Sequence, residues 1–228
     1  MNSGIDRILD LRNDMSDYVF HFTKGKHKNA KKTLCKILDD DKIIANVRTG
    51  VICFTEAPIN LLAELFEYFN QFPIPMYSPY GIAIRKDEFF KLGGRPAIYG
   101  EVSEKKLLHH SIQWRFVEYS PNKNDFSWLR EWRIETATID LSTIVNKIII
   151  TKTLQEEVDL AYSYKDINID GCVSDGQFYP EYSIEAGREE KSLSIELIKN
   201  QIIRTREDLK ITLLRQTPNE NITLSLGS

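Results

Sequence analysis

Hydrophobic positions along the chain change between strand-like and helix-like spacing in short segments. Residues 18–22, YVFHF, are aromatic and β-branched and predict a strand, which runs into the cationic turn TKGKHKN. A helix is expected next, with apolar residues at helical spacing at Ala30, Leu34, Ile37 and Leu38. Pro58 suits the first turn of a further helix. The apolar face of that helix would carry Leu61, Leu62, Leu65, Phe66 and Phe69.

Later segments predict strands and short helices in irregular order. Residues 71–81, QFPIPMYSPYG, hold three prolines and are expected to form a loop, because proline neither donates to a ladder nor continues a helix. Residues 131–139, EWRIETATI, alternate cleanly and predict a strand. The other expected strands are DKIIANV, GVICF, YGIAIRK, RPAIYG, NKIIIT, DGCVSD and, last in the chain, DLKITLLRQT. The other expected helices are a short one over 5–11, DEFFKLGG, LQEEVDLAYSY, and one that carries Leu193, Leu197, Ile198 and Ile202. The segment LLHHSIQWRFVEYSPNKNDFSW is expected to form a helix and then a loop.

This order does not alternate regularly enough for a doubly wound sheet, so one mixed α/β domain is expected. We expect it to span residues 1–228, with the C-terminal helix and strand, 190–215, as an appendage that covers the core. No internal repeat or linker divides the chain.

Composition excludes several functional classes. An apolar fraction of 42% is ordinary for a globular protein and argues against wholesale disorder. With 30 Lys+Arg against 33 Asp+Glu the net charge is -3, so any nucleic-acid contact must come from a local basic patch. Three cysteines without CxxC spacing exclude a disulfide framework and a cysteine zinc site. A charged N-terminus and the lack of an apolar run of about 20 residues lead us to expect a cytoplasmic protein with no membrane span. We also expect no metal.

The first candidate site is His21-Phe22-Thr23, where the first strand ends. In a strand His21 and Thr23 lie on one side, so an imidazole and a hydroxyl could hydrogen-bond a ribose or a carboxamide. The alternative is a histidine satisfied by backbone near a strand end. A local basic run follows, either a solvated face or a contact for pyrophosphate or an RNA backbone; it consists of Lys24, Lys26, Lys28, Lys31 and Lys32.

Two further segments place polar or aromatic residues where a strand meets a loop. GVICFTEAP would put Thr55 or Glu56 near a helix N-terminus, either for binding or as an ordinary capped turn. Tyr80-Gly81 could present a ring at a cleft edge, with glycine allowing close approach of a ligand, or could simply begin a core strand.

The segment WLREWRIET supplies a candidate catalytic carboxylate. On a strand Glu131, Arg133 and Glu135 share one face. An arginine neighbour keeps a carboxylate ionised, and an ionised carboxylate can accept a hydrogen bond from a sugar hydroxyl while positive charge develops on the ring. A solvent-facing ladder of salt bridges is the alternative. The chain has neither GxGxxG nor GxxxxGK[ST], so dinucleotide-fingerprint and P-loop sites have no support.

Taken in order, these segments resemble a known family. HFTK, GVICFTEAP, YGIAIRKDEFFKLGGRPAIYG and LREWRI, separated by helices, look like the AbiGi-type abortive-infection family of bacteria. More broadly they resemble the ADP-ribosyltransferase-like fold of poly(ADP-ribose) polymerases, RNA 2′-phosphotransferases and DarT-type phage-defence toxins. The resemblance covers residues 18–150. It implies an α+β split fold of two packed mixed β-sheets, with flanking helices and with NAD in a central cleft.

The resemblance also implies roles for particular residues. His21 matches the first-strand position, Thr23 the small polar residue after it, and Glu131 the later glutamate. Cys53 stands where the polymerases carry a tyrosine, which leaves Phe54 as the aromatic of that strand. The second stacking aromatic would fall around Phe66 or Tyr68. The implied catalytic residues are Glu131 and His21; the implied NAD contacts are His21, Thr23, Phe54, Thr55, Phe66, Tyr80 and Arg133.

The function implied is an NAD-dependent ADP-ribosyltransferase of antiphage defence. Nucleic acid is slightly preferred over protein as its acceptor, and a cognate antitoxin is a further expected partner. The alternative is a catalytically inactive binding or antitoxin-like module of the same fold, which the substitution at Cys53 favours. The enzymatic hypothesis requires His21 and Glu131 to face one cleft.

Overall fold

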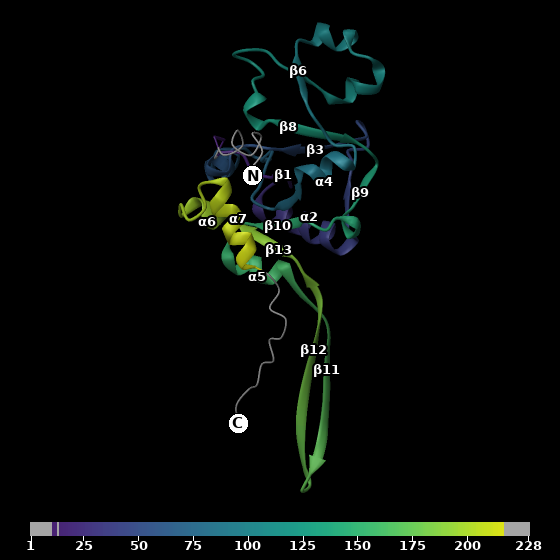
Figure 1. Ribbon diagram of the computed structural model, residues 1–228, viewed down its shortest axis with the longest axis vertical. Helices are drawn as coiled ribbons and strands as arrows, with labels where there is room; N and C mark the ends of the chain where they lie inside the picture. The colour runs from purple at the N-terminus through teal and green to yellow at the C-terminus, as the bar shows by residue number, and fades with distance from the viewer. Residues whose placement is uncertain (1–10, 13, 217–228) are drawn as a thin grey trace, which may run out of the picture.

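A seven-stranded mixed sheet forms the centre of the molecule (Figure 1). The structure, a computed structural model, describes residues 11, 12 and 14–216, and for residues 158, 161–172 and 178–189 it describes the backbone. The seven strands are β1 (Tyr18–Phe22), β3 (Val51–Thr55), β4 (Gly81–Arg85), β5 (Arg95–Pro96), β8 (Glu131–Glu135), β10 (Lys147–Thr151) and β13 (Lys191–Ser194). They lie in the order β13-β10-β4-β1-β3-β8-β5. β13 runs parallel to β10, and the other neighbours are antiparallel.

This sheet is divided between β1 and β3. β1 pairs with β4 along its whole length, and β3 pairs with β8 along its whole length. β1 and β3 share the single register pair Phe20↔Thr55. The four strands β13-β10-β4-β1 and the three strands β3-β8-β5 are therefore joined at one point, and regular pairing stops beyond it, towards Phe22 and Cys53. We call this place the split.

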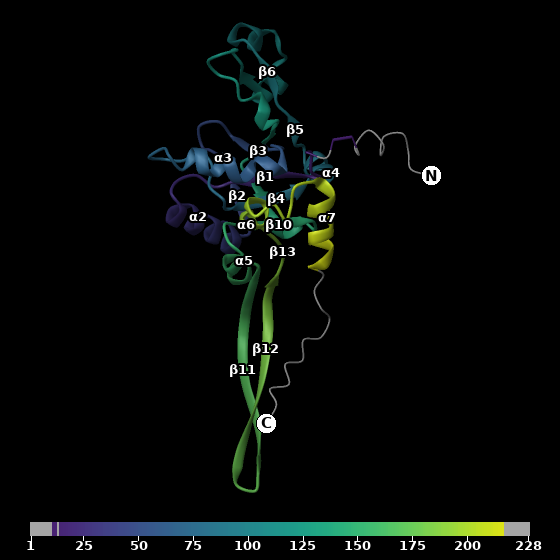
Figure 2. The ribbon, with the colours of Figure 1, turned by 90° about the vertical axis from the view of Figure 1, so that its left-hand side faces the viewer.

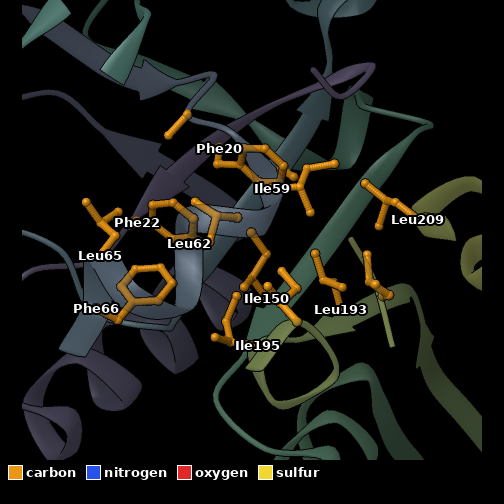
Figure 3. Packing of buried hydrophobic residues seen from close by; sticks show 14 of the residues in the cluster. Phe20, Phe22, Ile59, Leu62, Leu65, Phe66, Ile150, Leu193, Ile195 and Leu209 are labelled. Atoms are coloured by element: carbon orange, nitrogen blue, oxygen red, sulfur yellow. The ribbon is translucent and has the colours of Figure 1, made fainter. Parts of the chain in front are cut away.

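Helices cover both faces of the sheet because the central strands bury side chains on both sides. One face carries α2 (His27–Asp40), α4 (Lys86–Lys91) and α5 (Leu154–Ala161). The other carries η1 (Ile59–Leu61), α3 (Leu62–Phe69), α6 (Ile195–Lys199) and α7 (Arg206–Arg215). Alternation along β1 sends Val19 to the first face and Phe20 and Phe22 to the second. Figure 3 shows this second cluster, in which Phe20 and Phe22 of β1 lie beside side chains of η1 and α3, and Ile150 of β10 and Leu193 of β13 continue the same layer.

Three two-stranded sheets complete the described chain. They are β2 (Lys42–Ile44) with β9 (Thr138–Asp140), β6 (Ile98–Gly100) with β7 (Phe116–Glu118), and β11 (Tyr162–Ser174) with β12 (Gln177–Glu189). Short 3-10 helices are η2 (Val102–Leu107), η3 (His110–Arg115), η4 (Ser127–Leu129) and η5 (Leu141–Thr143). The β6–β7 lobe and the long β11–β12 hairpin extend from opposite ends of the body (Figure 1 and Figure 2).

The fold is α+β, as the sequence predicts, but its sheets differ from the expectation. In place of two packed mixed β-sheets there is one seven-stranded sheet with a weak junction. The expected strands in YVFHF, GVICF, YGIAIRK and NKIIIT are confirmed, and so are the helices α2 and α3. EWRIETATI, expected as one strand, forms two: β8 ends at Glu135, and β9 pairs with β2 outside the seven-stranded sheet. In α3 the predicted apolar face is buried at Leu62, Leu65, Phe66 and Phe69, whereas Leu61 lies before the helix and is exposed.

Several expectations fail in the second half of the chain. Residues 208–215, expected as a strand, form most of α7, because Thr205 and Asp208 make a capping box that starts a helix there. α5 ends at Ala161, and the next residues begin the hairpin. The segment 107–128 forms 3-10 turns and β7 in place of a helix and loop. The predicted helix over 5–11 falls almost wholly outside the described residues. Along the part of the chain that is described, no helix has the length and apolar character to cross a membrane.

Candidate functional site

His21 lies at the split, where its ring takes the place of strand pairing. Its Nδ1 is 2.9 Å from the backbone carbonyl oxygen of Cys53, and its ring lies 5.3 Å from the ring of Phe54. Because a carbonyl only accepts hydrogen bonds, Nδ1 carries the hydrogen and Nε2 is left as an acceptor in the neutral ring. Burial lowers the pKa of His21, and the positive charge of Lys24 lowers it further. The imidazole therefore ties β3 to β1 in its neutral form.

Glu131 is the first residue of β8 and is held from two sides. Arg133 Nε donates to its Oε1 at 2.7 Å, and the backbone N–H of Glu131 donates to the hydroxyl of Tyr99 at 2.9 Å. Arg133 in turn donates from Nη1 to the carbonyls of Trp114 and Phe116, at 3.2 and 2.7 Å. The carboxylate side chain is 11% exposed. This ion pair is thus anchored to the lobe that contains η3 and β7, and it is no ladder on an open surface.

The register places His21 and Glu131 on opposite faces of the sheet. In antiparallel strands directly paired residues point to the same side. Phe20 pairs with Thr55, and Thr55 pairs with Glu131, so the side chain of Glu131 lies on the same face of the sheet as that of Phe20. His21, one residue on from Phe20, faces the other way. The register therefore does not support the expected convergence of His21 and Glu131 on one cleft, because the two residues stand at opposite parity.

The two threonines expected at the site are buried and support the backbone. Thr23 is 3% exposed and Thr55 is 1% exposed. Thr23 Oγ1 donates to the carbonyl of Tyr80 at 3.0 Å. Thr55 Oγ1 donates to the carbonyl of Leu129 and accepts from the N–H of Ala57 at 3.1 Å. Thr55 therefore stabilises the turn that follows β3, in agreement with the capped-turn interpretation. The hydrogen bonds of both hydroxyls go to backbone groups.

The aromatic residues expected to stack on nicotinamide lie in the hydrophobic core. Phe54 is 2% exposed and its ring is 4.4 Å from that of Phe89. Phe66 is 5% exposed and meets Phe22 edge to face at 4.8 Å. Tyr80 is 2% exposed, on the α2 face, and its hydroxyl donates to Glu156 Oε1 at 3.0 Å. The structure does not bring these three rings to the carboxylate.

Glu56, the alternative to Thr55 in the same segment, is a buried ion-pair partner. It is 5% exposed. Lys86 Nζ donates to its Oε1 at 2.8 Å and Trp132 Nε1 donates to its Oε2 at 2.9 Å. The carboxylate thereby links the turn after β3 to α4 and β8, which is a structural role.

Residues that do surround Glu131 come from four different segments. We call them the Glu131 cluster: Cys53, Tyr77, Tyr99, Glu131 and Arg133. The Cys53 residue is exposed at the surface, and desolvation of its thiol by the surrounding protein, followed by the negative charge of Glu131, raises the pKa of the thiol. Burial raises the pKa of Tyr77, and again the charge of Glu131 adds to it. The pKa of Tyr99 is raised by burial as well. The thiol and both phenols therefore keep their protons at neutral pH and can act as hydrogen-bond donors.

Tyr99 and Tyr77 are the two residues of this cluster that sequence reasoning missed. Tyr77 lies in the proline-rich loop before β4. Its ring packs edge to face on Phe22 at 6.1 Å and on Phe69 at 5.4 Å. The loop that carries it is fixed to the segment after β1, since Ser78 N–H donates to the carbonyl of Thr23 at 2.9 Å and Gly25 N–H donates to that of Pro75 at 3.0 Å. Tyr77 and Tyr80 occur in nearly the same sequence context, so only the path of the loop distinguishes the ring at the cluster from the ring in the core.

The cluster offers an oriented carboxylate, a guanidinium and protonated donors, and it offers no metal site. Within residues 11–216 as described, no group of three or more His, Cys, Asp or Glu side chains could hold a metal ion. Such a carboxylate can stabilise positive charge that develops on a sugar ring. Comparison with known proteins adds no assignment: no protein-family model, no curated protein and no solved structure matches the chain.

Proposed function

We propose that the chain is an NAD-dependent ADP-ribosyltransferase that acts in bacterial antiphage defence, with Glu131 as its catalytic carboxylate. The observation that carries the proposal is the Glu131 cluster: a carboxylate that is 11% exposed, oriented by Arg133 at 2.7 Å and lying among protonated phenols. The α+β fold, with its sheet joined by one register pair between β1 and β3, is compatible with a split ADP-ribosyltransferase-like fold.

In the proposed reaction, nicotinamide stacks against the ring of Tyr77. Glu131 accepts a hydrogen bond from the 2′-hydroxyl of the nicotinamide ribose while the glycosidic bond to nicotinamide breaks and positive charge develops on the sugar. Arg133 fixes the orientation of that carboxylate. Lys24 and the basic turn after β1 are the candidates for the pyrophosphate. Nicotinamide leaves with the electron pair of the broken glycosidic bond. A nucleophile of the acceptor forms the new bond to the same ribose carbon and gives up its proton to solvent.

His21 has a positioning role in this proposal in place of a catalytic one. Its hydrogen bond to the Cys53 carbonyl holds β3 to β1 where backbone pairing has stopped. Cys53 neighbours Arg133 in the register, so the position of the Glu131 cluster depends on that bond.

The experiment is nicotinamide release from NAD by the purified full chain, with single-stranded DNA, RNA or cell lysate as acceptor. Glu131→Gln keeps the size of the side chain and removes the charge, so release should fall by at least about 100-fold, as for the loss of a preorganised electrostatic group. The matched control is Glu135→Gln, in the same strand and on the same face but exposed, which should keep wild-type activity. Equal rates in Glu131→Gln and wild type, or an inert wild type with every acceptor, would remove the enzymatic proposal.

A second candidate is a binding or antitoxin-like module that does not turn over NAD. The observation in its favour is that five of the seven residues expected to contact NAD, Thr23, Phe54, Thr55, Phe66 and Tyr80, are at most 5% exposed. Titration calorimetry with NAD separates the two candidates. Absence of heat with NAD, together with an inert wild type, would favour the module.

A further inference from the structure

An aromatic groove lies beside the Glu131 cluster, between α3 and the segment that precedes β8. Its volume is about 800 Å³. One wall is the end of α3 and the loop after it, and the other is the stretch around η4. The lining side chains that matter here are Tyr68, Phe72, Ile74, Met76, Phe126 and Trp128. We call this the aromatic groove.

Aromatic rings in the groove face solvent although the core is close by. Tyr68 is 56% exposed, Phe72 is 44% exposed and Trp128 is 40% exposed. The rings of Tyr68 and Phe72 meet edge to face at 5.5 Å. Exposed apolar surface that is gathered in one place, and not scattered, marks a binding surface on a globular protein.

Packed rings connect the groove with the candidate active site. Phe69, a lining residue, contacts both Phe72 and Tyr77, with ring centroids 6.2 and 5.4 Å apart. Tyr77 belongs to the Glu131 cluster. The groove and the cluster are therefore neighbours that share the packing of Phe69.

One lysine lines the groove, and two more stand on a turn that is hydrogen-bonded to the groove loop. Lys123 lines the groove itself. Lys24 and Lys26 stand on the turn after β1, which is bonded to the groove loop through Gly25 N–H and the Pro75 carbonyl. The Lys26 ammonium also donates to the carbonyl of Asn70, at the start of that loop. The acidic residue of the lining is Asp125. Its carboxylate accepts hydrogen bonds from the hydroxyl and the N–H of Ser127, so it is engaged within its own turn.

We propose that the aromatic groove binds single-stranded nucleic acid, with bases stacked on Tyr68, Phe72 and Trp128 and phosphates paired with Lys123 and Lys24. Flat exposed rings bordered by cations are how proteins hold unpaired strands without reading their sequence, since every base has a face to stack and every nucleotide has a charge. That the bound strand is the ADP-ribose acceptor rests on the proposed function; binding of the strand does not.

The test is fluorescence anisotropy with short fluorescein-labelled single-stranded DNA and RNA of mixed sequence, without NAD. The protein should bind both strands more tightly than the duplex of the same sequence. Tyr68→Ala, Phe72→Ala and Trp128→Ala should each weaken binding about tenfold. Lys123→Ala should lower the slope of log affinity against log salt by about 0.7, the value for removing one lysine–phosphate pair from a complex with a single strand. These side chains are exposed, so the variants are expected to fold, and circular dichroism checks that they do.

The matched controls are an exposed apolar residue and an exposed lysine away from the groove, Ile202→Ala and Lys36→Ala, which should bind like wild type. Absence of binding to either strand at low salt overturns the inference, and so does binding that the three ring substitutions leave unchanged. Groove-dependent binding of an unfolded polypeptide with no binding of oligonucleotides overturns it too and assigns the groove to a protein. Repeating the titration with Glu131→Gln separates the two proposals. If this variant binds the single strands but releases no nicotinamide, the groove inference holds independently of the reaction. If the wild type releases nicotinamide but binds no single strand, the enzymatic proposal holds and the groove inference fails.

Discussion

At the scale of single residues, parity in a strand decides what a side chain can do. His21 and Phe22 are adjacent, yet the ring of His21 is bonded to the Cys53 carbonyl while Phe22 packs with Phe66 on the opposite face. The residue types at the proposed site were predictable from the pattern HFT and EWR. Their directions were not, because direction depends on the register of β1, β3 and β8, which no local pattern encodes.

The shifted titration of His21 gives a prediction about stability and pH. Its pKa is lowered from the ordinary value of 6.5, first by burial and then by Lys24. Below 6.5 the unfolded chain therefore binds a proton that the native state takes up only at lower pH. The stability from the neutral His21 is complete above 6.5 and is lost as the pH falls below it, towards the lower folded-state pKa.

In His21→Gln this part of the pH dependence should disappear, while the amide can still donate to the Cys53 carbonyl. The measurement is the free energy of urea unfolding from pH 5 to 8. His27, whose pKa is also lowered, contributes equally to both proteins and cancels in their difference. Exposed His110→Gln is the control and should follow the wild-type curve. A His21→Gln curve parallel to wild type across this range would contradict the assignment.

At the scale of elements, the four-stranded part of the sheet, β13-β10-β4-β1, depends on the close approach of β1 and β4. Gly81 begins β4 opposite Phe22. A Cβ at Gly81 would lie 2.2 Å from the backbone oxygen of His21, far inside contact distance, and backbone atoms cannot turn away as a side-chain tip can. The sequence leaves two interpretations of this glycine open, the close approach of a ligand and the start of a core strand. The structure supports the second, because the glycine admits the neighbouring strand.

Gly81→Ala should therefore force β1 and β4 apart and cost at least about 2 kcal/mol of unfolding free energy, at the level of overpacking in a core. Chemical denaturation followed by tryptophan fluorescence measures it. Gly50→Ala, at the turn before β3, is the comparison: Gly50 has positive φ but nothing within 4 Å of the new Cβ, so the substitution should cost less, about 1 kcal/mol for the backbone conformation alone. A loss at Gly81 no larger than at Gly50 would show that the strands can move apart freely.

At the scale of the whole molecule, a compact body carries a lobe at one end and a long hairpin at the other (Figure 2). β11 and β12 pair with each other from Tyr162↔Glu189 to Ser174↔Gln177 and with no other described strand. An isolated two-stranded hairpin has little stability of its own in water. The body beneath it does not depend on it for its sheet, since β10 and β13 already pair directly.

Replacing residues 163–188 by a short glycine-rich turn should accordingly leave the body folded. We expect a change in its unfolding free energy of less than about 1 kcal/mol, because shortening a loop changes the closure entropy by little. If the proposals above hold, nicotinamide release and strand binding should also persist, because the Glu131 cluster and the aromatic groove lie in the other half of the chain. The shortened protein and the full chain are compared by denaturant unfolding and by the two assays. Loss of cooperative unfolding in the shortened protein would show that the hairpin supports the fold.

The sequence by itself determined most helices and strands in residues 18–91, and the strands that begin at Glu131 and Lys147, since there the apolar period is long enough to distinguish 3.6 from 2. It also identified the segments that carry polar chemistry, His21 with Thr23 and Glu131 with Arg133. Tertiary structure alone decided that the central sheet is one, that Tyr77 and not Tyr80 is near Glu131, and that an aromatic groove lies between α3 and η4. The physical reason is that strand register and loop path are fixed by contacts between residues far apart in the chain, and a one-residue change in either turns a side chain from the core to the site.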